Sequence, residues 1–248
     1  MFELKLDNAK YWRDCVEAIV SLVDEGIFAV GEDGIGLHAM DPSGISMISF
    51  FIPSNAFSKY EIDKPVDLGL NMDNLNKVMS RTRDNEALMM KENDGRLLME
   101  FIGEKSRRRY RLHLIDMRKK EDKEPKVEFD ANVEMDGEHL KNVLKDASLI
   151  SSYIAFKAAK DQFAINAKGD SSDLEEMNEV DGVSVKKLDV SKDAAATFNL
   201  EFLENMVRSN PVGNALTLSL KSDQPLRVSY KIGEATVTYY LAPYVEES

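Results

Sequence analysis

An internal repeat constrains the fold of this chain more than any other feature. The segment NMDNLNKVM (Asn71–Met79) recurs as NLEFLENMV (Asn199–Val207), and Ala87-Leu88 recurs as Ala215-Leu216 at the same offset. The earlier parts of the two copies match more loosely and at a slightly longer offset, which takes Asp7 to Asp136 and Asp41 to Asp170. Two matches in the same order at nearly the same offset indicate a structural unit that is used twice.

Each copy is predicted to contain a helix, strands, a second helix and further strands. Residues 7–41 and 136–170 each hold a helix-like segment followed by two strand-like segments. Apolar stripes at helical spacing predict four short helices, with the residues Trp12, Val16, Ile19, Val20 and Val23; Leu75, Val78 and Met79; Leu140, Val143, Leu144 and Ala147; and Leu200, Leu203 and Val207. Alternating runs predict antiparallel strands over Leu97–Ile102, Tyr110–Ile115, Ala215–Leu220, Leu226–Ile232 and Ala235–Leu241. The predicted fold class is α+β, with two similar domains that each carry two short helices and antiparallel sheets.

A charged connector separates the two copies. Residues 117–128 (MRKKEDKEPKVE) are almost all charged and include Pro125, a composition typical of a solvated linker. We therefore expect an N-terminal domain over residues 1–116 and a C-terminal domain over residues 129–248. No apolar run approaches the roughly 20 residues of a membrane span, and MFELKLDNAK lacks the apolar core of a signal peptide. With Cys15 as the single cysteine, these features predict a reducing, intracellular location.

The sequence does not indicate catalytic chemistry. The three histidines, His38, His113 and His139, are far apart and lack metal-ligand spacing. The glycines of residues 31–36 (GEDGIG) do not form a dinucleotide-binding fingerprint. In GLHAMDPSGISM, residues 36–47, the sequence DPSG predicts a turn between two strands rather than a nucleophile. We expect no cofactor and no metal site, and a metal-dependent enzyme that uses clustered acidic residues is the alternative from a different class.

Six short segments, spread over the chain, resemble the sequence of a known protein family. They are MFELKLDNA at the start, DGIGLHAMDPSGISMI (Asp33–Ile48), SKYEID (Ser58–Asp63), GLNMDNLNKVM (Gly69–Met79), LID (Leu114–Asp116) before the connector, and YYLAP (Tyr239–Pro243). Each is short, but together their order and spacing resemble the sliding clamp family, proliferating cell nuclear antigen (PCNA) of archaeal type. The duplication described above is what the fold of that family requires.

The resemblance implies a ring-forming trimer, in which three copies join head to tail around duplex DNA. Such a sliding clamp is not an enzyme; it tethers DNA polymerase and other replication and repair proteins, and acts as a processivity factor by raising their effective concentration. The implied partners are double-stranded DNA without sequence preference, further copies of this chain, and a DNA polymerase, a clamp loader, a flap nuclease and a DNA ligase that dock through short peptide motifs. No membrane partner is implied, and the location is cytoplasmic, at the nucleoid of an archaeal-type cell. A subunit of a heterotrimeric or checkpoint-type clamp is the nearer alternative.

Basic residues on the predicted helices are candidates for DNA contacts. They avoid the apolar stripes, and pairs three or four residues apart share an exposed face. They are Lys10, Arg13, Lys77, Arg81, Lys141, Lys145 and Arg208, with Arg83 just beyond the second helix. Contacts of this kind reach phosphates alone and are salt-dependent. Acidic residues in the same segments, and the preference of bases for helix C-termini, leave a solvated helix surface as the other interpretation. The net charge of −12 argues only against a protein that coats nucleic acid with its whole surface.

Two strands of opposite charge are the predicted subunit edges, because a head-to-tail ring needs two different complementary surfaces. SRRRYRLHL (Ser106–Leu114) is basic, and DLEEMNE (Asp173–Glu179) is acidic. The resemblance implies that these strands pair between neighbouring subunits and that an aromatic residue lies at the position of Tyr110. We predict backbone pairing reinforced by arginine–carboxylate contacts, with the interface residues Arg107, Arg109, Tyr110, Arg111, Leu174, Glu175 and Glu176.

Two alternatives to this interface stay open. Arg81 and Arg83 are able to serve the subunit interface instead, facing Glu138 and Asp146. The run RRRYR, which includes Arg108, also fits a nucleic-acid or localisation patch.

For partner docking, the resemblance implies that three separated segments converge on an apolar pocket for short peptides. The candidate residues are Met40, Asp41, Pro42, Ser43, Ile45, Met117, Val127, Leu241, Ala242, Pro243 and Tyr244. The connector departs from the family pattern, which has an apolar pair midway, because its apolar candidates Met117 and Val127 lie at its ends. We therefore expect the peptide contacts to be more electrostatic in this chain.

Overall fold

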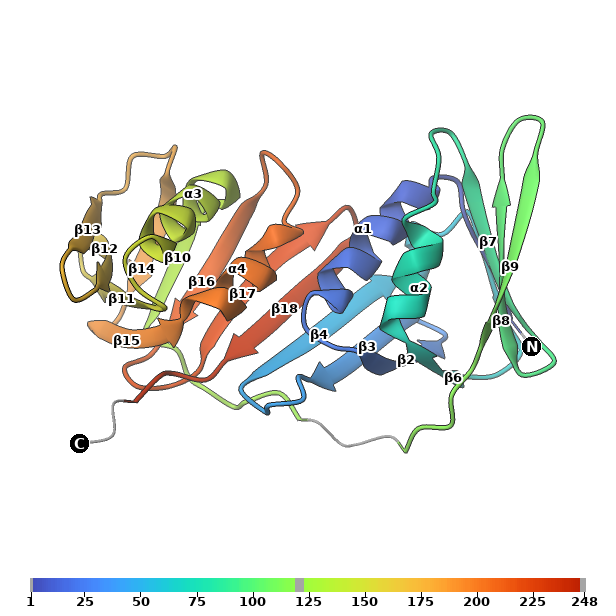
Figure 1. Cartoon of the computed structure of the whole chain (residues 1–248), viewed down its shortest axis with the longest axis horizontal. Helices are drawn as coiled ribbons and strands as arrows, with labels where there is room; N and C mark the ends of the chain where they lie inside the picture. Colours follow the sequence, from blue (N-terminus) through green and yellow to red (C-terminus); the bar gives the residue numbers. More distant parts are fainter. Residues whose placement is uncertain (1, 119–122, 246–248) are drawn as a thin grey trace. The chain divides into compact units, whose positions relative to one another are not determined.

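The computed structural model of the chain describes residues 2–118 and 123–245 (Figure 1). Within these residues, four α-helices and eighteen β-strands form two compact units. The first unit comprises Met1–Pro42, Ile48–Asp122 and Ile232–Val237, and the second comprises Ser43–Met47, Lys123–Lys231 and Thr238–Ser248. In the described part of the chain, no helix is long and apolar enough to cross a membrane.

The first unit contains two helices that pack against each other, α1 (Ala9–Val20) and α2 (Met72–Met79). Its strands are β1 (Phe2–Leu6), β2 (Glu25–Gly31), β3 (Gly34–Met40), β4 (Ser46–Pro53), β5 (Lys59–Ile62), β6 (Val66–Asn71), β7 (Ala87–Asn93), β8 (Arg96–Ile102) and β9 (Arg107–His113), with a short 3-10 helix at Ser54–Ala56. One sheet has the order β5-β1-β7-β8-β9, and the other strands follow the order β6-β2-β3-β4. The basic strand β9 is therefore an edge strand.

The second unit repeats this plan with helices α3 (Gly137–Ser148) and α4 (Leu200–Arg208). Its strands are β10 (Ala131–Asp136), β11 (Tyr153–Ala159), β12 (Gln162–Lys168), β13 (Asp173–Asn178), β14 (Val185–Val190), β15 (Ala194–Asn199), β16 (Ala215–Leu220), β17 (Leu226–Ile232) and β18 (Ala235–Leu241). One sheet has the order β13-β12-β11-β15, and the remaining strands follow the order β14-β10-β16-β17-β18. The acidic strand β13 is also an edge strand.

The predicted repeat is confirmed, with one correction. The first residues of α1 and α2, Ala9 and Met72, correspond at a single offset to those of α3 and α4, Gly137 and Leu200. The slightly longer offset thus holds for the first strand of each unit, from Phe2 of β1 to Ala131 of β10, but not for the first helix.

Each of the four α-helices begins after a capping side chain. An Asn or Asp precedes it, and the side chain of that residue accepts a backbone N–H of the first turn at 2.8–3.4 Å. These N-caps at Asn8, Asn71, Asp136 and Asn199 each contribute about 1 kcal/mol to helix stability. The two copies thus share the start signal of their helices as well as their order.

The apolar stripes form the cores of the two units. All of the predicted stripe residues are buried except Val20, which is half-buried. Trp12 packs against Phe28 and Phe50, with ring centroids 5.6 and 6.2 Å apart. The predicted bounds of β16, β17 and β18 are confirmed, while β9 starts before the predicted Tyr110, because Arg107 continues the ladder opposite Ile102 of β8.

The chain immediately before the charged connector is hydrogen-bonded to β6. The backbone N–H of Ile115 donates to the carbonyl of Gly69 at 2.9 Å. A Cβ at Gly69 would overlap the carbonyl oxygen of Ile115, so only glycine allows this approach. In the second unit, the N–H of Asp130 donates to the carbonyl of Leu220 at 2.9 Å. Residues 119–122 of the predicted connector lie outside the described residues.

Candidate functional site

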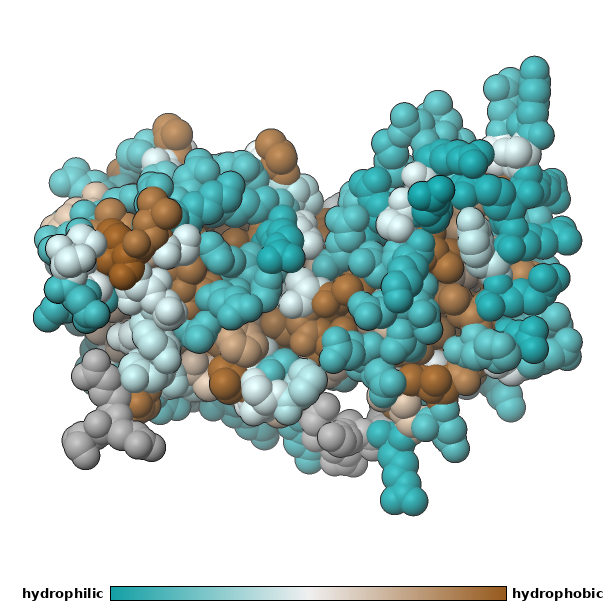
Figure 2. Space-filling view, viewed as in Figure 1, coloured by the Kyte–Doolittle hydropathy of each residue, from teal (hydrophilic) through white to brown (hydrophobic). Residues whose placement is uncertain are grey.

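Hydrophilic side chains cover the outer faces of the helices in each unit, as Figure 2 shows. Half of the eight basic candidates on these surfaces already bind a neighbour. Lys10 pairs with Asp84, Arg13 with Asp14 at 2.6 Å, and Lys141 with Glu138 at 2.8 Å. The fourth, Arg208, donates to the side-chain oxygen of Asn205 at 2.6 Å, which leaves its charge uncompensated.

The other four basic candidates are Lys77, Arg81, Arg83 and Lys145. All four are exposed, and within the described residues none of their side chains has an ion pair or a hydrogen bond. These side chains, together with Arg208, supply the positive charge that remains available to an anionic partner. Of the four contacts, only Lys10–Asp84 joins residues far apart in sequence, while the partners of Arg13, Lys141 and Arg208 lie within three residues of them.

Arg81 lies beyond helix α2, not on it as its spacing from Lys77 suggested, and Arg83 lies beyond the helix as expected. The helix ends at Met79 because side chains satisfy its last carbonyls: the hydroxyl of Ser80 donates to Lys77 O at 3.0 Å, and that of Thr82 donates to Met79 O at 2.6 Å. Arg81 and Arg83 are therefore presented by a loop.

The outward face of edge strand β9 carries the predicted interface arginines. Arg107, Arg109 and Arg111 are exposed and alternate with half-buried residues. Arg109 donates to Glu100 of β8 at 3.1 Å, and Arg107 lies 3.9 Å from the same carboxylate, whose side chain is only 5% exposed. Glu100 therefore offsets part of the charge of this face and holds the side chain of Arg109 by a hydrogen bond.

Arg108 points to the opposite face of β9, together with Tyr110. Its guanidinium donates to Glu86 at 2.5 Å and lies 5.0 Å from the centre of the Phe101 ring. Tyr110 packs edge-on against Phe101 at 5.7 Å. The alternation of the strand separates Arg108 from the other arginines, but its partner Glu86 is a loop residue that no local pattern indicates.

A histidine of helix α3 makes polar contacts with side chains of the acidic edge strand β13. Nε2 of His139 lies 2.9 Å from Glu176 and 3.1 Å from the side-chain oxygen of Asn178. Glu175 is exposed on the other face of the strand, and Leu174 is half-buried. Glu175 is thus available to a partner, whereas Glu176 already has one.

The predicted partner-docking residues differ in accessibility. Met40, Ile45 and Tyr244 are 46%, 42% and 40% exposed, large fractions for apolar side chains. Pro42 and Ser43 are exposed, Met117, Val127, Ala242 and Pro243 are half-buried, and Asp41 is buried. Leu241 corrects the expectation, because it is fully buried and its side chain belongs to the core. The N–H of Ala242 donates to the carbonyl of Ile45 at 2.9 Å, which joins two of these segments within the second unit.

Two family models cover the chain. The N-terminal domain of proliferating cell nuclear antigen matches residues 1–123, and its C-terminal domain matches residues 123–245. The chain belongs to the proliferating cell nuclear antigen family. The predicted resemblance and the predicted clamp fold are therefore confirmed.

Individual PCNA relatives are similar to this chain along their whole length. Proteins named DNA polymerase sliding clamp from Thermococcus gammatolerans and Pyrococcus furiosus are each 33% identical over 247 residues, which cover 99% of both chains. PCNA from Thermococcus kodakaraensis shares the fold, with a TM-score of 0.94 at 23% identity over 98% of this chain and 100% of that chain. A structure of A. fulgidus PCNA bound to the C-terminal region of FEN-1 has a TM-score of 0.90 at 26% identity over the whole of both chains.

As a sliding clamp of the PCNA family, the chain is a processivity factor and not an enzyme. In the described part of the chain, no group of three or more His, Cys, Asp and Glu side chains is arranged to hold a metal ion. Cys15 is buried, and burial raises the pKa of its thiol far above the ordinary value, so it stays protonated and unreactive at neutral pH.

Proposed function

We propose that three copies of this chain form a closed ring around duplex DNA and tether replication and repair proteins to it. The observation that carries the proposal is the match to both PCNA domain models, which together span residues 1–245. Each chain supplies residues 1–116 and 129–248 as its two clamp domains, with residues 117–128 as the connector. The ring acts in the cytoplasm, at the nucleoid.

The helix surfaces face the DNA in this proposal. Lys10, Arg13, Lys77, Arg81, Arg83, Lys141, Lys145 and Arg208 lie toward the phosphates, and the cations without a carboxylate partner dominate the attraction. A ring held by charge alone has no preferred register on the duplex, because phosphates carry no sequence information. Such contacts keep the ring on DNA and allow it to slide.

Strands β9 and β13 join neighbouring copies. Both are edge strands with unpaired backbone groups, which is the arrangement that permits a strand of another chain to add to a sheet. Arg107, Arg109 and Arg111 meet the acidic side chains of β13, including Glu175, while Tyr110 and Leu174 pack against each other on the opposite faces of the two strands. The presence of a basic edge and an acidic edge on one chain favours a homotrimer over a heterotrimeric or checkpoint-type clamp.

Partner proteins dock through short peptides at the segment from Met40 to Ile45, the connector and the residues after β18. The exposed apolar side chains of Met40, Ile45 and Tyr244 support this assignment. The FEN-1 segment bound to the A. fulgidus relative supports a flap nuclease as one partner. A DNA polymerase, a clamp loader and a DNA ligase are the further partners that we propose.

Two measurements on the same preparation test the proposed function. Sedimentation equilibrium gives the mass of the assembly, and primer extension on primed circular DNA gives polymerase stimulation. We expect three times the chain mass of 28.0 kDa and longer extension products. A monomer that leaves the products unchanged when it is the only clamp subunit present would contradict the homotrimer.

A further inference from the structure

We propose that a cationic pocket beside the connector, with Lys126, Lys221 and Arg227 in its lining, binds an acidic residue of the docked peptide. This inference rests on the proposed docking of partner peptides, and it adds a chemical requirement that an apolar docking surface lacks. The pocket lies wholly within the second unit.

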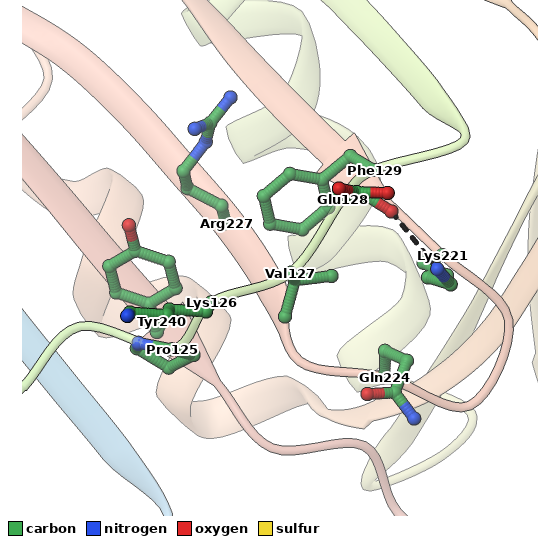
Figure 3. Close-up of a pocket in the computed structure, with 9 residues that line it drawn as sticks. All are labelled: Pro125, Lys126, Val127, Glu128, Phe129, Lys221, Gln224, Arg227 and Tyr240. Carbon is green, nitrogen blue, oxygen red and sulfur yellow. Dashed lines mark hydrogen bonds between the residues drawn. The ribbon is translucent and has the colours of Figure 1, made fainter.

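The pocket is an open hollow of about 460 Å³ (Figure 3). Residues 125–129, at the end of the connector, cross one side of it, and Arg227 of β17 and Tyr240 of β18 come from the strands. Lys221 and Gln224 come from the β16–β17 turn. This volume lies within the roughly 300–1,000 Å³ of small-ligand sites and is sufficient for one or two peptide side chains.

Positive charge in the pocket exceeds negative charge, although the chain as a whole has a net charge of −12. Three cationic side chains and one carboxylate, that of Glu128, line it. Lys221 donates to the backbone carbonyl of Glu128 at 3.2 Å, not to its carboxylate. Considering only described residues, none of the three cations has a carboxylate within the 4.0 Å of an ion pair. A cleft lined by one sign of charge concentrates ligands of the other sign.

Arg227 is held in place without being neutralised. Its guanidinium lies 4.7 Å from the centre of the Phe129 ring and donates to the hydroxyl of Ser219 at 3.0 Å. That hydroxyl in turn donates to Asn132 at 2.7 Å. Nε of Arg227 is buried and has no hydrogen-bond partner. A cation that is already oriented loses little conformational freedom when it binds a carboxylate.

The walls of the pocket favour a peptide over a bare phosphate. Pro125, Val127, Phe129 and Tyr240 present apolar surface around the cations. The hydroxyl of Tyr240 donates to Glu124 at 2.8 Å, so the ring is fixed against the connector. An Asp or Glu beside an apolar residue matches both features, whereas a phosphate backbone offers no counterpart to the apolar walls.

Fluorescence anisotropy with labelled peptides tests the inference. The parent probe is a peptide from the C-terminal region of FEN-1, and its derivatives carry three added Asp, Asn or Lys residues at either end. At about 50 mM NaCl we expect the better Asp derivative to bind about tenfold more tightly than the matching Asn derivative. At about 300 mM NaCl the advantage shrinks, because salt screens partly exposed charges.

Two double variants separate the pocket from bulk charge. Lys126→Gln with Lys221→Gln leaves the packed Arg227 intact, and we expect it to reduce the Asp advantage over Asn to about twofold or less, with both derivatives measured on the same variant. Lys157→Gln with Lys160→Gln removes the same charge at two exposed positions of the same unit and serves as the control. This control variant should bind the Asp derivative about tenfold more tightly than the Asn derivative, as the wild type does.

Three outcomes would overturn the inference. If the parent peptide binds but Asp and Asn derivatives bind equally, the acidic subsite fails and peptide docking stands. If the two double variants behave alike, the advantage comes from bulk charge and not from the pocket. If a short duplex DNA displaces the Asp derivative from the wild type but not from the Lys126/Lys221 variant, the pocket binds DNA phosphates and not an acidic residue of the peptide. Failure of every peptide to bind would instead reject the docking proposal, and the subsite with it.

Discussion

The guanidinium of Arg108 donates to the carboxylate of Glu86 at 2.5 Å, with side-chain exposures of only 19% and 3%. Glu86 also accepts the backbone N–H of Arg83 at 2.8 Å. One carboxylate thus connects the edge strand β9, the proposed subunit interface, to the loop that presents a candidate DNA-contacting arginine. The geometry of both proposed surfaces depends on it.

Replacing Glu86 with Gln is expected to reduce the free energy of unfolding by about 2 kcal/mol near neutral pH, because the hydrogen bonds from the Arg108 guanidinium and the Arg83 backbone N–H lose their charged acceptor. Burial acts to raise the pKa of Glu86, but the hydrogen bonds and charges of Arg108 and Arg83 outweigh it and hold that pKa below 4.5. A depressed pKa gives stability that is present above 4.5 and is lost as the pH falls through the folded-state value. Urea unfolding should therefore show a difference that narrows in acid; an equal difference at neutral and acid pH would contradict it.

Reversing Arg107, Arg109 and Arg111 to Glu is expected to dissociate the ring into monomers of 28.0 kDa, measured by sedimentation equilibrium. The same positions changed to Gln provide a milder variant, because three new carboxylates beside the buried Glu100 also strain β9. Adding Glu175→Arg to the reversed variant should restore part of the trimer by exchanging the charges across the interface. An intact trimer in the reversed variant would exclude β9 as the interface.

The two groups of helix-surface cations are expected to differ in DNA binding. Changing Lys77 and Arg81 to Gln should lower the slope of log affinity against log salt by about 1 for each lost phosphate contact, measured with a short duplex. Changing Lys10 and Arg13 to Gln should have a smaller effect, because Asp84 and Asp14 already neutralise them. Equal effects of the two pairs would show that these ion pairs open when DNA binds.

The contribution of Tyr11 to the stability of the first unit decreases in alkali. Its hydroxyl accepts the N–H of Ala235 at 2.9 Å, and burial raises its pKa to about 12. The contribution is full below the ordinary value of 10.0 and is lost as the pH rises toward 12. Tyr11→Phe should therefore cost about 1 kcal/mol near neutral pH and less in alkali, measured by urea unfolding. A cost that does not change with pH would contradict this account.

The elements with one buried face were predictable from local patterns. Strands β16, β17 and β18 have the predicted bounds, because their apolar residues alternate toward the core. The helical stripes are likewise buried, since their spacing alone determines which side chains face inward. Alternation within β9 also separates Arg108 from its neighbours, so its inward position was available from the sequence.

The partners of these side chains were not predictable. Glu86 and Arg108 are 22 residues apart, and Tyr240 and Glu124 are 116 apart, so only the folded chain brings them together. The pairing of Lys10 with Asp84 was unpredictable for the same reason. The partners of Arg13, Lys141 and Arg208 lie within three residues of them, but sequence alone does not show which of the many nearby polar side chains a cation binds. The burial of Leu241 is a different case, because Leu241 is in phase with Ala235, Val237 and Tyr239 of β18 and the predicted alternation already indicated it.

Gly69 controls the freedom of the connector without being part of it. Its missing side chain allows Ile115 to lie directly on β6, so the chain is anchored immediately before the connector begins. A larger residue at this position would release Ile115 and lengthen the tether, at an entropic cost that grows only slowly with length. Peptide affinity would then change through the conformational entropy of a longer tether, although every docking side chain remains. The missing side chain of Gly69 thus determines how far along the chain, to Ile115, the backbone is held on β6.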